Sequence, residues 1–234
     1  MIPIFIIVHD RITVLKHSIN SFLSQIKYPI KIIFHDVAST YKPCLDYLDE
    51  MKSNGYMIYR SETNDHLTVM DSVKDYLQKN TNVKYYIITD PDILLDNVND
   101  NILQFYIWLL EEEKKKGNNY VIGPMLRIDD IPNFYPRKKL AIKRHVQQFW
   151  KKKPINISWN GSIYQIQYSP IDTTFQLIDA TNLSTTFPRQ GIRCYSPYSA
   201  KHLDWYIDPK NMQPDQTYYS KTSSNISHWS NNLI

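Results

Sequence analysis

Glycine is scarce in this chain, at only 5 of its 234 residues. The five positions lie far apart, at Gly55, Gly117, Gly123, Gly161 and Gly191. The sequence therefore has no GxGxxG loop, no Walker A loop and no GxSxG elbow, all of which use glycine to bring the backbone close to a ligand. A nucleotide bound by this chain would have to be held by side chains and a metal ion.

Long apolar runs and cysteines are also lacking. The longest apolar run, Ile4 to Val8, falls far short of the roughly 20 residues that cross a membrane. It has no basic flank and no small-residue cleavage site, so we expect a strand of a soluble chain and not a signal peptide. Two cysteines, Cys44 and Cys194, cannot by themselves form a disulfide framework or a four-ligand zinc site. A reducing, cytoplasmic location fits this usage.

Neither sign of charge dominates, since 27 Lys and Arg accompany 23 Asp and Glu, for a formal net charge of +4. That balance is too mild to predict a nucleic-acid partner. One basic concentration spans residues 137–153, where Ile142, Val146, Phe149 and Trp150 recur at the spacing of a helix over about 138–151. A solvated basic face over an apolar stripe is the simplest interpretation. The alternatives are an acceptor-side helix, a peripheral contact with an anionic membrane or, least attractive beside so many carboxylates, a nucleic-acid contact.

Short apolar runs alternate with helical patterns through the first half of the chain. Strands are predicted at 4–8, 30–34, 56–60, 85–88 and 120–122, with helices between them at about 14–23, 45–54, 67–77 and 102–116. This order predicts an α/β fold with a Rossmann-like, mostly parallel central sheet flanked by helices. After residue 124 the composition shifts to Pro, Asn, Ser, Thr and Tyr, so we expect an irregular second half, 126–234, of the same single domain as 1–125.

The predicted strands end in polar, mostly acidic residues. Asp10 follows the first strand, Asp36 the second, Glu62 to Asp65 the third, and Asp90-Pro91-Asp92 the fourth. Ligands of open α/β sheets bind at this edge. Any one of these carboxylates is more often a turn or cap residue, but four acidic strand ends together predict a site for cations and hydroxyls. Asp90 and Asp92 offer the hard oxygen ligands that suit Mg²⁺ or Mn²⁺ bound to phosphate.

With these elements in place, the sequence resembles the glycosyltransferases of the GT-A fold, especially family-two-like members. The resemblance covers roughly residues 1–125, including Ser21-Phe22-Leu23-Ser24-Gln25, Ile32 to Asp36, and Tyr85 to Asp92. It implies that Asp10, Arg11 and Asp36 hold the base and ribose. It also implies that Asp90 and Asp92 bind the ribose and, through a divalent metal, the diphosphate. The sequence departs from the family in having His35-Asp36 in place of an Asp-Asp pair, and in lacking the later acidic pair.

The second half offers further candidates. The segments Ile171 to Phe175 and His202 to Tyr206 resemble parts of small glycosyltransferase-like proteins, where such segments line the acceptor side. Metal sites of this fold often recruit a C-terminal histidine, which the resemblance transfers to His202 or His228. Asp172, on a turn before an apolar strand, is the candidate general base of an inverting transfer. Bracing of that turn by Asp172 and core packing by His202 are the structural alternatives.

These observations together predict a metal-dependent glycosyltransferase that uses Mn²⁺ or Mg²⁺. Its donor would be a nucleotide-diphosphate sugar of the UDP or GDP type, and its acceptor a hydroxyl on a glycan, a protein or a lipid. A sugar nucleotidyltransferase is the nearest enzymatic alternative, although His9 to Thr13 offers no glycine-rich phosphate loop. A carbohydrate- or nucleotide-binding module without catalysis is the other, supported by 18 Tyr and 5 Trp.

Overall fold

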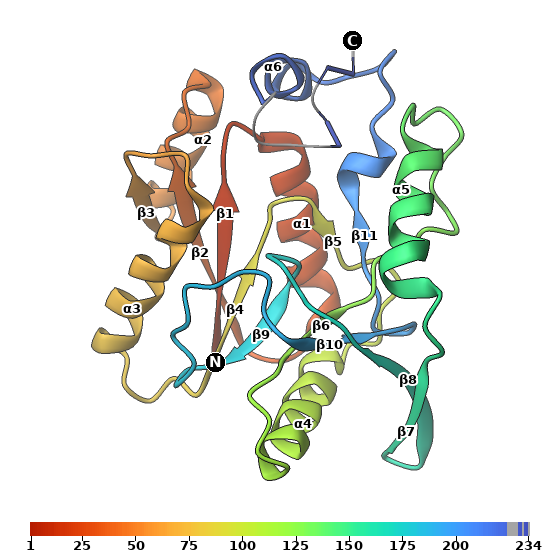
Figure 1. Ribbon diagram of the computed structural model, residues 1–234. Helices are drawn as coiled ribbons and strands as arrows, with labels where there is room; N and C mark the ends of the chain where they lie inside the picture. Colours follow the sequence, from red (N-terminus) through yellow and green to blue (C-terminus); the bar gives the residue numbers. More distant parts are fainter. Residues whose placement is uncertain (224–228, 231, 234) are drawn as a thin grey trace.

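The chain folds around one large mixed sheet with helices on both faces (Figure 1). The computed structural model describes residues 1–223, 229–230 and 232–233. The elements of the first half are β1 (Ile2–Val8), α1 (Ile12–Gln25), β2 (Ile30–Val37), α2 (Lys42–Ser53), β3 (Met57–Ser61), the 3₁₀ helix η1 (His66–Thr68), α3 (Val69–Lys79), β4 (Tyr85–Thr89), β5 (Ile93–Leu94), α4 (Ile102–Lys115) and β6 (Val121–Pro124). The alternation predicted for this half is confirmed, and β5 is an addition to it.

The second half continues the same sheet. Its elements are α5 (Lys138–His145), the π-helix η2 (Val146–Trp150), β7 (Ile155–Trp159), β8 (Ser162–Tyr168), β9 (Gln176–Asp179), β10 (Gly191–Cys194), β11 (Lys201–His202), the 3₁₀ helix η3 (Leu203–Tyr206) and α6 (Pro214–Thr222). It holds more regular structure than its composition suggests. The predicted basic helix over about 138–151 is observed as α5 and η2.

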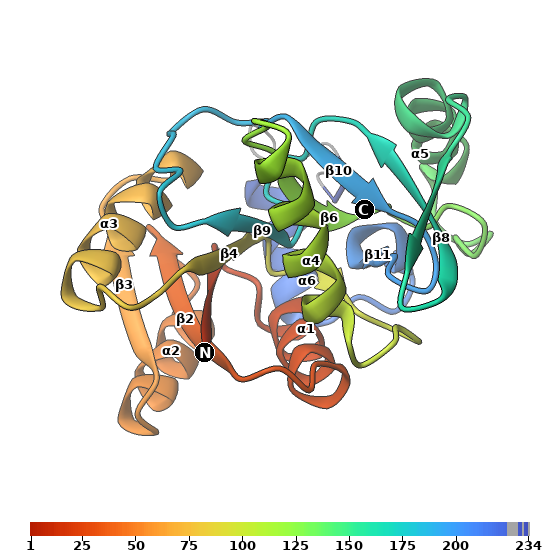
Figure 2. The same ribbon diagram turned by 90° about the horizontal axis from the view of Figure 1, so that it is seen from below.

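The strand order is β3-β2-β1-β4-β9-β6-β10-β8-β7. The first four of these strands are parallel, as are β6 and β10, whereas β9 is antiparallel to both of its neighbours. Figure 2 shows β9 between β4 and β6. The predicted α/β class is therefore confirmed, and a strand from the second half enters the middle of the sheet.

Two apolar layers hold this sheet between its helices. Side chains alternate along β1, so Ile4 and Ile6 pack into the layer that includes α1 and α4, while Phe5 and Ile7 pack into the layer that includes α3. All seven residues of β1 are buried, as expected of a strand covered on both faces. Burial of each large apolar side chain contributes roughly 1.5–3 kcal/mol to folding. These layers fix the carboxyl ends of β1, β2 and β4 at one edge.

None of the helices in the described part of the chain has both the length and the apolar character needed to cross a lipid bilayer.

Candidate functional site

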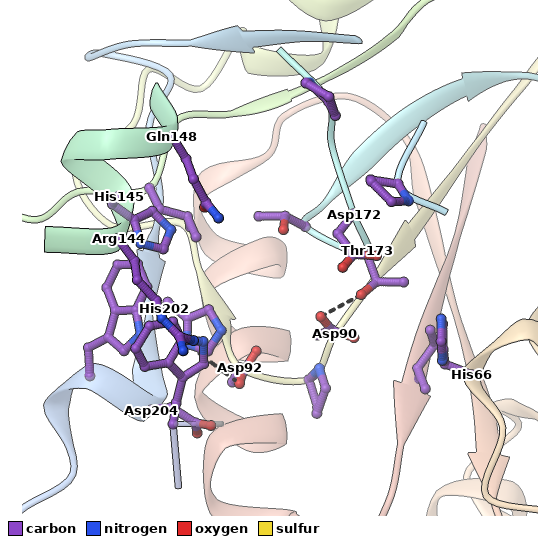
Figure 3. A pocket seen from close by; sticks show the side chains of 18 of the residues that line it. His66, Asp90, Asp92, Arg144, His145, Gln148, Asp172, Thr173, His202 and Asp204 are labelled. Atoms are coloured by element: carbon purple, nitrogen blue, oxygen red, sulfur yellow. Dashed lines mark hydrogen bonds and ion pairs between the residues drawn. The ribbon is translucent and has the colours of Figure 1, made fainter. Parts of the chain in front are cut away.

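A pocket of about 920 Å³ opens at the carboxyl ends of β1 and β4 (Figure 3). Its floor contains Asp90 and Asp92, which follow β4. One end is formed by residues of β1, β2 and the segment before η1, and the opposite end by α5, η2 and the segments around β8 and β10. The pocket therefore lies where ligands of open α/β sheets bind, and both halves of the chain build it.

The segment Asp90-Pro91-Asp92 is held in the pocket by Thr173. The backbone N–H of Asp90 donates to the carbonyl oxygen of Thr173 at 2.7 Å, and the Thr173 hydroxyl donates to Oδ2 of Asp90 at 2.6 Å. Burial, and after it the charge of Asp92, raises the pKa of Asp90 well above its usual range. The Asp90 side chain therefore lines the pocket while one of its oxygens accepts a hydrogen bond from the Thr173 hydroxyl. Its predicted contacts with ribose and metal stay predictions.

Asp92, His202 and Asp204 form a group whose ligand atoms all lie within 4.8 Å of one another. Two long-range contacts assemble it: β11 pairs with β5, setting His202 opposite Ile93, and the N–H of Leu203 donates to the Asp92 carbonyl at 2.7 Å. The structure therefore brings together the predicted ligands Asp92 and His202. Asp204 was missed from the sequence, although its His-x-Asp spacing with His202 offered a signal.

Arg11 binds two members of this group. Its Nη1 donates to Oδ2 of Asp92 at 2.9 Å, and its Nη2 donates to Oδ1 of Asp204. The Arg11 guanidinium also lies over the ring of Tyr219, 4.6 Å from the centroid. Burial raises the pKa of Asp92, whereas the charge of a protonated His202 and the charge and hydrogen bond of Arg11 lower it, and the net direction is downward. Arg11 therefore orients the carboxylates, and its predicted contact with the nucleotide stays a prediction.

The group fits a divalent cation on its own chemistry. Asp92 Oδ1 and His202 Nδ1 are buried and have no hydrogen-bond partner within the described structure. Burial lowers the pKa of His202, which favours the neutral imidazole that ligates metals. The Trp205 ring stacks on the His202 ring, with centroids 4.9 Å apart and planes inclined by 10°, and fixes its orientation. Two carboxylates and one imidazole suit Mn²⁺, Mg²⁺ or a similar ion.

Asp172 lies beside this floor. Figure 3 shows its side chain near Thr173 and Asp90, and it is exposed to the pocket. Among the described residues, none hydrogen-bonds the Asp172 carboxylate, whereas its backbone carbonyl accepts from Thr174 at 2.7 Å. The backbone of Asp172 braces the turn, which leaves its carboxylate available as a base; that role stays a prediction.

The structure brings neither Asp10 nor Asp36 into the described lining of the pocket. The carboxylate of Asp10 accepts the N–H groups of Thr40 and Tyr41, both at 2.7 Å, and that of Asp36 accepts the N–H of Ser39 at 3.1 Å. Both carboxylates thus hold the loop after β2, and their predicted contacts with base and ribose remain untested. His228, the other predicted ligand, lies outside the described residues.

The end of the pocket formed by β1, β2 and the segment around η1 contains residues that sequence reasoning missed. These are His9, Asn64 and His66, from β1's carboxyl end and the segment before α3. Nδ1 of His9 donates to the Val37 carbonyl at 2.8 Å, so in the neutral ring Nε2 accepts from Asn64 at 3.1 Å. In the sequence, these three residues were marked only by their positions, since His9 follows a predicted strand and Asn64 and His66 precede a predicted helix.

A buried histidine outside the pocket makes stability depend on pH. Nδ1 of His35 contacts Ser72 Oγ and Nε2 contacts Thr68 Oγ1, both at 2.8 Å, and burial lowers the pKa of His35 to about 4. The unfolded chain therefore binds more protons between about pH 6.5 and 4, so stability falls as pH falls through that window, by up to roughly 3 kcal/mol from this group.

We expect His35→Gln to flatten the loss of melting temperature between pH 7 and 5, measured by circular dichroism. The matched control is His17→Gln, at an exposed position of α1, which should keep the wild-type slope. An unchanged slope in His35→Gln would show that another group supplies it.

No family model and no curated protein matches this chain, but solved structures do. TarS 1–349 of S. aureus matches with 13% identity and a TM-score of 0.44, over 77% of this chain and 47% of that one. GalNAc-T7 with UDP, GalNAc and Mn²⁺ matches with 14% identity and a TM-score of 0.48, over 76% and 35%. The mannosyltransferase PcManGT of Pyrobaculum calidifontis, with GDP-Man and Mn²⁺, matches with 13% identity and a TM-score of 0.37, over 55% and 36%.

The chain resembles GT-A glycosyltransferases. The resemblance that the sequence predicted is thereby confirmed. This chain spans only about a third to a half of the length of these three structures. Because every TM-score lies below 0.5, the matches carry no conclusion about substrate or mechanism, and the chemistry has to be argued from the pocket itself.

Proposed function

We propose that this protein is a metal-dependent glycosyltransferase that uses a nucleotide-diphosphate sugar. The observation that carries the proposal is the group of Asp92, His202 and Asp204, with two buried ligand atoms unpartnered, at the floor of a large pocket beside the exposed carboxylate of Asp172. A cation site next to a free base is what sugar transfer from a diphosphate requires.

A UDP or GDP sugar is the donor we propose. TarS has been solved with UDP-GlcNAc and PcManGT with GDP-Man, and the donor that we propose is of the same class. The pocket is also large enough, because a volume of about 920 Å³ lies at the upper end of ordinary ligand sites. We propose that the nucleoside lies toward His9, Asn64 and His66 and the diphosphate toward Asp92.

The mechanism follows from the placement of these side chains. Asp92, His202 and Asp204 would hold Mn²⁺ or Mg²⁺, and the bound ion would neutralise charge that grows on the departing diphosphate. Arg11 donates hydrogen bonds to the Asp92 and Asp204 carboxylates and so fixes their orientation. Asp172 accepts the proton of the acceptor hydroxyl as that oxygen bonds to the anomeric carbon and the sugar–phosphate bond breaks.

The acceptor is proposed to carry its hydroxyl on a glycan, a protein or a lipid. Both cysteines are buried and unpaired, which supports a reducing, cytoplasmic setting. The proposal includes a peripheral contact with an anionic membrane, which the exposed basic residues of α5 support.

Thermal unfolding with added nucleotide tests the proposal. At a concentration 100 times its dissociation constant, a ligand adds about 2.7 kcal/mol to stability, and about 1 kcal/mol moves a domain of this size by roughly 2–4 °C. We therefore expect UDP or GDP with Mn²⁺ to raise the melting temperature by about 5 °C or more, and neither nucleotide to do so in EDTA. Equal shifts with and without Mn²⁺ would contradict the proposed metal, and binding without turnover of any donor would assign a binding module.

A further inference from the structure

The end of the pocket that faces α5 carries positive charge. Arg144 and Lys152 line it from α5 and the residues after η2, and Arg193 lines it from β10. Figure 3 shows Arg144 on α5 on the opposite side of Asp90 from His66. Within the described part of the chain, none of the ion pairs includes Arg144, Lys152 or Arg193. Of the three, Arg193 interacts with the charge of the Asp172 carboxylate, but none has a carboxylate of the described residues at ion-pair distance.

Arg193 is the fixed member of the three. Its residue is 4% exposed, and its Nε and Nη1 donate to the carbonyls of Pro170 at 3.0 Å and Pro124 at 3.2 Å. Its guanidinium lies 4.4 Å from the centroid of the Phe149 ring. Burial lowers the pKa of Arg193 to about 10, so it is still charged at neutral pH. Its direct hydrogen-bond partners are neutral carbonyls, and the Asp172 carboxylate raises its pKa from beyond ion-pair distance. A buried cation without a direct ion pair favours binding of an anion.

Unpartnered polar atoms lie beside Arg193. Gln167 stands opposite Arg193 in the pairing of β8 with β10, and its Oε1 accepts from the Tyr195 hydroxyl at 2.8 Å, which leaves Nε2 as a donor. That Nε2 atom and the hydroxyl of Ser169, a lining residue, are buried with no partner within the described structure. A buried donor without a partner is destabilising. The part of the pocket lined by Arg144, Lys152, Ser169 and Arg193, which we call the recess, therefore suits a ligand rich in acceptor oxygens.

The geometry points to an acceptor substrate that carries a phosphate-type oxyanion, bound at the α5 end of the pocket. Arg193, Arg144 and Lys152 supply its positive charge, and the Ser169 hydroxyl supplies a hydrogen bond. Guanidinium groups bind such oxyanions through paired N–H donors. The inference rests on the proposed function, because Asp172 lines the same pocket and would accept the proton of the acceptor hydroxyl. The oxyanion comes from a free sugar phosphate or from a lipid headgroup.

Calorimetric titration with glucose 6-phosphate and with glucose tests the recess. We expect only the phosphorylated sugar to bind, both in the absence of nucleotide and with saturating UDP and Mn²⁺. The double variant Arg144→Gln/Lys152→Gln, at exposed positions, should raise its dissociation constant at least about tenfold. The matched control Lys139→Gln/Lys143→Gln removes the same charge from exposed positions of α5 outside the pocket lining and should change it less than about twofold.

Sedimentation with phosphatidylglycerol or phosphatidylcholine vesicles distinguishes the source. Binding to phosphatidylglycerol that is lost in Arg144→Gln/Lys152→Gln but kept in the control would support a lipid headgroup in the recess. Equal losses in both double variants, for either probe, would overturn the inference in favour of a general basic surface. Displacement of glucose 6-phosphate by UDP with Mn²⁺ would also overturn it, because the anion would then occupy the diphosphate site. If UDP fails to bind, the proposed donor is wrong, while the titration without nucleotide still tests the recess.

Discussion

Replacement of Asp92 with alanine should abolish Mn²⁺-dependent binding of UDP or GDP and lower sugar transfer at least about 10³-fold. The variant loses one of the three proposed ligands of the metal ion. A bound metal ion stabilises the charge on the leaving diphosphate in the transition state by several kcal/mol, and this stabilisation would be lost. Asp204→Asn, at the ligand missed from the sequence, should weaken Mn²⁺ binding at least about tenfold. Calorimetric titration of Mn²⁺ and a radiolabelled transfer assay measure the two effects.

Asp96→Ala is the matched control for this experiment. Asp96 lies four residues further along the chain, pairs with Arg127 and Lys201, and is absent from the pocket lining. Asp92 also pairs with Arg11, so each variant loses an ion pair and their melting temperatures should be compared. Undiminished Mn²⁺-dependent nucleotide binding by folded Asp92→Ala would remove the proposed metal centre.

Replacement of Asp172 with asparagine should lower turnover at least about 10²-fold while the donor dissociation constant changes less than twofold. The amide keeps the shape of the side chain but cannot accept the proton of the acceptor hydroxyl. Because Asp172 is exposed and no described residue hydrogen-bonds its carboxylate, the melting temperature should stay within about 1 °C.

Three measurements on Asp172→Asn separate a base from a brace: turnover, donor affinity and melting temperature. Asp129→Asn, at an exposed position outside the pocket lining, is the control and should behave as wild type in all three. A parallel fall in all three for Asp172→Asn would indicate a structural role. Near-normal turnover with the donor still bound would favour a retaining mechanism or a base elsewhere.

The elements of the first half could be predicted because local patterns determine them. The run Ile4 to Val8 and the stripe of α1 recur with the periods of a buried strand and a half-buried helix, and both elements form where expected. The position of Asp90 and Asp92 at a strand end follows from the same patterns. The position of β9 between β4 and β6 could not be predicted in this way, because the local sequence of a four-residue strand does not indicate which strands it pairs with.

The sequence alone could not predict which side chains come together at the site. His202 and Asp204 reach Asp92 through pairing of two-residue strands more than 100 positions apart, and such short strands have no periodicity. The resemblance implies that Asp10 holds base or ribose, which stays a prediction. In the structure its backbone has φ of 56° and its carboxylate accepts the N–H groups before α2. The direction of a side chain after a strand depends on that local turn, which the residue types alone do not determine.

The position of β9 also has a consequence for synthesis of the chain. Asp179 is made 90 residues after Thr89, so β4 has emerged from the ribosome long before the strand that covers its free edge. At roughly 5–20 residues per second, that edge stays open for about 5–20 s. An uncovered apolar strand can pair with other chains in this interval, which makes the nascent protein a client for chaperones that shield strand edges.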